Sequence, residues 1–125
     1  MNALQLAKTA YATNKAPTRT PRGIEYEAFA RITHRLKSTA ERGMTGFPEL
    51  AQALHLNRQL WSMLAADVAE KGNGLPAELR ARIFYLSEFT ATHSRKVLRG
   101  DETVDALVEV NTAVMRGLRQ RAEAA

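Results

Sequence analysis

The sequence predicts an all-α fold, a small bundle of four to five helices with a short, linker-tethered N-terminal helix. Three observations support this prediction. No segment alternates apolar and polar residues with the β-branched enrichment of a strand. Apolar residues instead recur at helical spacing, and glycine and proline separate the segments in which they do so. The connections between these segments are short, which favours neighbouring helices that pack side by side.

We expect residues 1–125 to form a single helical domain, because a chain of this length buries one core. Residues 1–13 are predicted to form the short N-terminal helix. The polar stretch 14–20, which contains Pro17 and no apolar anchor, is predicted to be a linker. Residues 21–118 then form the helical core, and residues 119–125 form a fraying helix or tail.

Proline and glycine set the boundaries of the four longer helices. Pro21, Pro48 and Pro76 stand at helix starts, where the missing N–H would have had no intrahelical partner. Glycines at positions 43, 46, 72, 74 and 100 follow the predicted helix ends. The predicted helices therefore span about 21–42, 48–71, 76–99 and 102–118. Apolar residues on their inner faces form the expected core, which comprises Leu54, Trp61, Leu64, Leu79, Ile83, Leu86, Leu107 and Met115.

Positive charge is concentrated near the N-terminal end. The net charge is +5, and residues 1–46 have eight Lys/Arg against three Asp/Glu, whereas residues 100–125 have three against five. Such a basic end could attract an acidic protein or a nucleic acid. Arg31, Arg35 and Arg42 nevertheless lie opposite the apolar side of their predicted helix, where solvated charges normally sit.

The sequence offers no catalytic or metal-binding motif. His34, His55 and His93 lie on different predicted helices, and none has a second ligand at metal spacing. The chain has no cysteine and no phosphate-binding glycine loop. We therefore expect a protein that binds another protein, without catalysis, metal or cofactor. No apolar run approaches the roughly 20 residues of a membrane span, and no secretory signal is present, so we expect a cytoplasmic location and no membrane insertion.

Four polar side chains fall inside the apolar stripes of the predicted helices: Glu25, Asn57, His93 and Asn111. A buried polar group without a partner costs about 1–3 kcal/mol, so each of them needs one. One interpretation is that they pair with each other or with free backbone groups and fix helix register. The other is that one or two of them line a groove and hydrogen-bond a bound helix.

The predicted helix 76–99 has two apolar faces. Besides its main stripe, it presents Phe84, Ala91 and Leu98 on nearly the opposite side. A helix that is apolar on two faces either lies at the centre of its bundle or reserves one face for a partner.

Several blocks of the sequence together resemble a known family. The block at residues 57–67 reads NRQLWSMLAAD, and LPAELRARI follows at residues 75–83. The pattern continues through Leu86, Phe89, His93, Val97, Leu107, Val110-Asn111 and Met115-Arg116-Gly117-Leu118. Over residues 8–118 the blocks are similar, in order and spacing, to FlaF, the flagellar biosynthesis regulator of alphaproteobacteria.

The resemblance implies a role in flagellin handling. FlaF proteins act with FlbT, which restrains flagellin synthesis, and the family is regarded as flagellin-binding secretion chaperones. The chain is therefore expected to shield a terminal helix of flagellin, preferably in its C-terminal region, and to couple flagellin synthesis to secretion and filament assembly. FlbT and the flagellar export apparatus are further expected partners.

We assign the flagellin contact to six residues: Phe84, Ala91, Leu98, Asn57, Arg58 and His93. The first three form the second apolar face, while Asn57 and Arg58, with Trp61, belong to the family-like block and are either core or site. Replacing Phe84 by Glu is then expected to abolish flagellin capture without changing helicity or melting.

Alternative functions remain open at the level of sequence. The protein could regulate flagellin expression post-transcriptionally, acting on mRNA directly through its basic first third or through FlbT, and an RNA complex would weaken steeply with salt. It could instead be a module whose main partner is FlbT or the export gate. A separate hypothesis places the short helix 1–13 in the partner groove of the free protein, so that deletion of residues 1–16 tightens flagellin binding.

Overall fold

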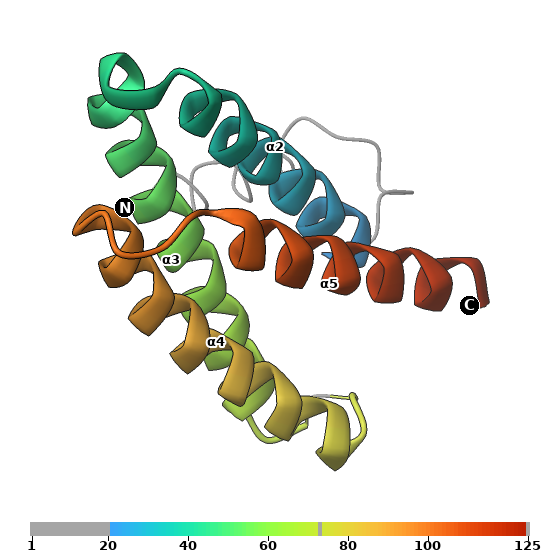
Figure 1. Ribbon diagram of the computed structural model, residues 1–125. Coiled ribbons are helices and arrows are strands. Elements are labelled where there is room, and N and C mark those ends of the chain that lie inside the picture. Colours follow the sequence, from blue (N-terminus) through green and yellow to red (C-terminus); the bar gives the residue numbers. More distant parts are fainter. Residues whose placement is uncertain (1–20, 73, 125) are drawn as a thin grey trace.

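Four α-helices and one short 3-10 helix make up the part of the chain that the structure describes. The computed structural model describes residues 21–72 and 74–124, with side chains over residues 26–72 and 74–119 (Figure 1). The elements are α2 (Pro21–Glu41), η1 (Gly43–Gly46), α3 (Phe47–Ala69), α4 (Ala77–Leu98) and α5 (Asp105–Ala124). These ranges contain no strand, which confirms the all-α prediction. The predicted helix 1–13 and linker 14–20 lie outside the described residues.

Glycines in the left-handed region of the backbone follow three of the helices. Gly43, Gly72 and Gly100 have φ values of 62°, 88° and 82°. L side chains rarely adopt such angles, which is why glycine stands at these helix ends. After α4, the Gly100 N–H donates to Val97 O at 3.0 Å and the Asp101 N–H donates to Lys96 O at 2.9 Å, so the last carbonyls of the helix are satisfied.

The last helix differs most from its predicted span. α5 begins at Asp105, where the Asp105 N–H donates to Thr103 Oγ1 at 3.3 Å. It continues to Ala124, so of the two alternatives expected for residues 119–125, a fraying helix or a tail, residues 119–124 are helical. The physical reason is that Arg, Gln, Ala and Glu, which fill these positions, are strong helix formers and no breaker follows Gly117.

The helices form two antiparallel pairs, α2 with α5 and α3 with α4, and the two pairs meet where α2 contacts α3. α4 packs on α3, α5 packs on α2, and α2 and α3 pack on each other. α4 and α5 contact each other little. Figure 1 shows α4 ending and α5 beginning at the same junction, from which the two helices diverge, so that the beginning of α4 and the end of α5 lie far apart.

Two apolar clusters fill the interior. The larger one joins α2, α3 and the first half of α4 through Ala28, Phe29, Leu60, Trp61, Leu64, Val68 and Ile83. Trp61 is 1% exposed, and its ring meets Phe29 edge to face with 5.5 Å between centroids. The second cluster lies nearer the α4–α5 junction and contains Leu36, Ala53, Leu54, Val97, Val104 and Leu107.

The residues expected in the core occupy two kinds of position. Five of them are buried: Leu54, Trp61, Leu64, Ile83 and Leu107. Leu79, Leu86 and Met115 are only partly buried and pack against the edge of the larger cluster. Leu79 and Leu86 border the space between α4 and α5.

The described residues were searched for a membrane-spanning helix and for a metal site. None of them is long and apolar enough to cross a membrane. Over the described residues, no three His, Asp or Glu side chains gather where they would hold a metal ion.

Candidate functional site: an apolar groove between α4 and α5

A hydrogen-bonded network lies where α2, α3 and α5 meet. We call it the amide network, and it consists of Thr33, Asn57, Trp61 and Asn111. Asn111 Nδ2 donates to Thr33 Oγ1 at 3.0 Å and to Asn57 Oδ1 at 2.8 Å. Trp61 Nε1 donates in turn to Asn111 Oδ1 at 2.9 Å. The polar residues Asn57 and Asn111 therefore pair with each other, as the first of the two interpretations holds.

This network corrects the assignment of Asn57 to the partner site. Asn57 is 0% exposed, so its side chain reaches no partner in this structure. His93 needs the same correction, because it is 8% exposed and its Nε2–H donates to Thr103 O at 2.9 Å. The His93 ring also stacks on Phe89 at 5.3 Å. Both residues act inside the fold; the side chain of Glu25 lies outside the described residues.

The second apolar face of α4 does lie at the surface. We call Phe84, Ala91 and Leu98 the outer stripe. Phe84 is 44% exposed and Leu98 is 37% exposed, while Ala91 is half-buried. α4 packs mainly on α3, so it is an edge helix and not the centre of the bundle. Arg58 is exposed on α3, beside a small depression that it shares with His55, Gln59, Ser62, Met63 and Ala66.

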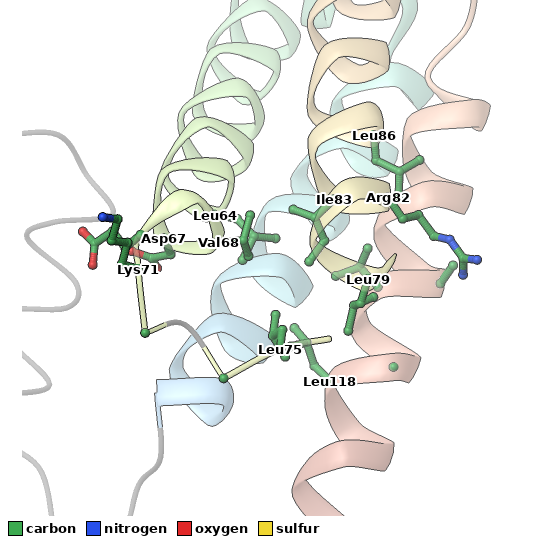
Figure 2. Close-up of a pocket in the computed structure, with 16 residues that line it drawn as sticks. Leu64, Asp67, Val68, Lys71, Leu75, Leu79, Arg82, Ile83, Leu86 and Leu118 are labelled. Carbon is green, nitrogen blue, oxygen red and sulfur yellow. The ribbon is translucent and has the colours of Figure 1, made fainter. Parts of the chain in front are cut away.

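A larger cavity opens between the diverging helices α4 and α5, and we call it the α4–α5 groove. Its volume is about 620 Å³. Leu64 and Val68 of α3 form its floor, as Figure 2 shows. The α4 wall consists of Leu79, Arg82, Ile83 and Leu86, the α5 wall consists of Ala113, Val114, Gly117 and Leu118, and Leu75 closes the end at the α3–α4 connection.

The groove is apolar inside and charged at its rim. Eight of its sixteen lining residues are leucine, isoleucine or valine. Asp67, Glu70 and Lys71 stand where α3 ends, and Arg82 stands on the α4 side. Figure 2 shows Asp67 and Lys71 on the α3 side and the Arg82 guanidinium pointing away from the leucines. An apolar floor with charged edges is the arrangement that binds one face of an amphipathic helix.

Two structural causes keep the groove open. α4 and α5 pack on different helices, so neither fills the space between them. On the α5 wall, Ala113 and Gly117 have short side chains or none, and a Cβ added at Gly117 would meet nothing within 4 Å. A glycine inside a helix costs roughly 0.5–1 kcal/mol relative to alanine, and here its effect is an unobstructed wall.

None of the six residues assigned to the partner site lines this groove. Phe84 lies about 160° around α4 from Leu86, on the side of the helix away from the groove. The groove uses Leu64, Leu79, Ile83 and Leu86 instead, which we had assigned to the core. Gly117 was the available signal, because a mid-helix glycine that neither caps nor turns calls for a packing reason.

The fold and the groove together define a class: an all-helical protein with an apolar groove between two of its helices. Comparison with known families makes this specific. The family model described as flagellar protein FlaF matches residues 7–118. The chain belongs to the FlaF family and is a flagellar protein. No curated protein and no solved structure matches it.

Proposed function

We propose that this chain is a flagellin-binding export chaperone that holds a terminal helix of flagellin in the α4–α5 groove. The supporting observation is the groove itself, an apolar cavity of about 620 Å³ in a flagellar protein. We favour the C-terminal region of flagellin as the bound segment. Bound flagellin is thereby kept from premature assembly, and the amount of free chaperone couples flagellin synthesis to its secretion.

The proposed complex follows from the burial of apolar surface. An unassembled flagellin helix exposes one apolar face, and its anchors at i, i+3, i+4 and i+7 would lie on the partly exposed leucines of the groove, Leu75, Leu79 and Leu86. Each square ångström of apolar surface removed from water contributes about 25 cal/mol. A segment that folds as it binds loses conformational entropy, which lowers the net affinity and allows release at the export apparatus.

The outer stripe is a second candidate site for binding flagellin. Phe84 is 44% exposed and its neighbour Tyr85 is 67% exposed, so α4 presents apolar surface away from the groove. That surface would suit either flagellin or another flagellar partner such as FlbT. We favour the groove because it is concave and covers a helix on three sides, whereas the outer stripe lies on a single edge helix.

A substitution at Gly117 tests the groove without damaging the core. A leucine at this position extends into open space, fills part of the groove and removes a helix-interior glycine. We expect Gly117→Leu to melt at the same temperature as the natural protein or higher, and to bind a C-terminal flagellin peptide at least about tenfold more weakly. Peptide titration by calorimetry and thermal melting by circular dichroism measure the two effects.

Arg116 provides the matched control. Arg116 is exposed on α5 and does not line the groove. Arg116→Leu therefore introduces a leucine at the neighbouring position, outside the groove. Its affinity for the peptide should equal that of the natural protein. If Gly117→Leu is folded and binds the peptide normally, the groove is not the flagellin site.

A further inference from the structure

We infer that the amide network is the positioning device of the α4–α5 groove, because it fixes the rotation and register of α5 against α2 and α3. The inference rests on the proposed function only for what the groove binds. It concerns Asn111 first, since this residue alone joins α5 to both other helices through side-chain hydrogen bonds among the described residues.

The α5 wall needs such a device because α4 does not hold it. α4 and α5 touch little beyond their junction, so the width of the groove depends on how α5 sits on α2 and α3. The apolar contacts there involve Leu107, which is fully buried in the second cluster, and further along α5 Val110, Val114, Met115 and Leu118, which are only partly buried. Apolar contact has no preferred direction and tolerates a sliding or rotating helix.

Hydrogen bonds, in contrast, are directional. Asn111 uses both hydrogens of its amide group and its carbonyl oxygen, with three partners at 2.8–3.0 Å on two helices. A shift of α5 by one residue turns this side chain by about 100° and breaks all three bonds. Asn111, Val114 and Leu118 follow one another at helical spacing along one side of α5, so the rotation that satisfies Asn111 also aims Val114 and Leu118 at the groove.

The residues of the network are better suited to fixing the position of α5 than to stabilising the fold. Asn57 Nδ2 is buried and has no hydrogen-bond partner in the described part of the chain. Replacing buried polar groups by apolar side chains of similar size is often neutral or stabilising. Single buried polar residues are, on the other hand, well known to select one helix register among several apolar alternatives.

A comparison of two variants separates position from stability in the full chain. Asn111→Leu leaves Asn57 and the Trp61 N–H without their partners, so its melting temperature should fall. Asn57→Leu combined with Asn111→Leu also removes the unpaired Asn57 amide, so the part of the loss that Asn57 causes should return, while the Trp61 N–H still lacks its acceptor. In both variants we expect α5 to sample more than one position and flagellin peptide to bind at least about fivefold more weakly.

The chain itself provides two clean reporters. It has no cysteine, so spin labels on Glu88→Cys in α4 and Arg116→Cys in α5 are unique, and the distance between these exposed sites reports the opening of the groove. It has one tryptophan, whose N–H belongs to the network, so the near-ultraviolet circular dichroism of Trp61 reports the bond to Asn111. Both measurements are made without flagellin.

Leu60→Ala is the matched control, because Leu60 is buried on α3, does not line the groove and has no part in the network. It should lower the melting temperature and leave the α4–α5 distance and the peptide affinity unchanged.

The inference is overturned if the double variant shows the same narrow distribution of α4–α5 distances as the natural protein, whether or not it binds the peptide. If Asn111→Leu does not fold, Thr33→Val removes one partner alone and should broaden the distances in the same direction. Failure of the natural protein to bind peptide contradicts the proposed function and leaves the distance test valid.

Discussion

Trp61 lies at the meeting point of the apolar core and the amide network. Its ring meets Phe29 edge to face, and its N–H donates to Asn111 at 2.9 Å. A buried indole needs both an apolar contact for its rings and an acceptor for its N–H, and this site provides both. The large residues around it are fully buried, so changes there affect the whole fold.

The contact with Phe29 should be among the most important single contributions to stability. Phe29 is 0% exposed, so Phe29→Ala leaves a cavity and removes the edge-to-face contact with Trp61. We expect the free energy of unfolding to fall by about 3–5 kcal/mol, measured by urea denaturation. Tyr85→Ala, at a position that is 67% exposed, should change it by less than about 0.5 kcal/mol. A small effect of Phe29→Ala would contradict the core described here.

Individual residues were only partly predictable from the sequence. Asn57 and Asn111 stood in apolar stripes, so a shared polar contact was foreseeable from helical periodicity. Thr33 was not foreseeable as their third partner, because threonine is common on both faces of a helix and only tertiary packing brings residues 33 and 111 together. The burial of His93 against Thr103 depends on the turn between α4 and α5.

At the scale of elements, proline and glycine predicted the helix boundaries because they act through local backbone geometry. Gly43, Gly72 and Gly100 follow helix ends with positive φ, and Pro48 stands in the first turn of α3. Where no such residue stands, the sequence left the boundary open, as at the end of α5, where a fraying helix and a tail were both expected. Propensity sets a helix end only weakly when good helix formers continue to the last residues.

Two glycines inside or beside helices should respond to alanine in opposite ways. A Cβ at Gly117 meets nothing within 4 Å, so Gly117→Ala should raise the free energy of unfolding by about 0.5–1 kcal/mol. A Cβ at Gly46 would lie 2.7 Å from both Arg42 Cβ and Thr39 O, so Gly46→Ala should lower it by about 1–3 kcal/mol. Chemical denaturation of both variants measures the difference, and equal effects would contradict this description of the two sites.

At the scale of the whole molecule, the groove arises from the arrangement of helix pairs. Each helix showed its apolar stripe in the sequence, and the stripes of α3 and α4 were assigned to a closed core. The divergence of α4 and α5 leaves part of those stripes open, with Leu79 and Leu86 only partly buried. Crossing angles depend on packing between residues distant in sequence, so this opening could not be read from periodicity alone.

The dependence of binding on salt distinguishes the proposed complex from an RNA complex. A helix bound by apolar contact should lose less than about twofold in affinity between roughly 50 and 200 mM salt. RNA bound through several phosphate contacts would lose orders of magnitude over the same range. Fluorescence anisotropy with labelled flagellin peptide and with flagellin mRNA measures both, and a steep loss for the peptide would argue against the groove.

Site-specific crosslinking tests most directly whether flagellin lies in the α4–α5 groove. Because the chain has no cysteine, a photoreactive group can be attached at one introduced cysteine, either Ala113→Cys on the α5 wall or Ala91→Cys on the outer stripe. Illumination with full-length flagellin should crosslink the Ala113 position strongly and the Ala91 position little, and excess C-terminal peptide should suppress the product. Crosslinking from Ala91 with none from Ala113 would place flagellin on the outer stripe and contradict the groove.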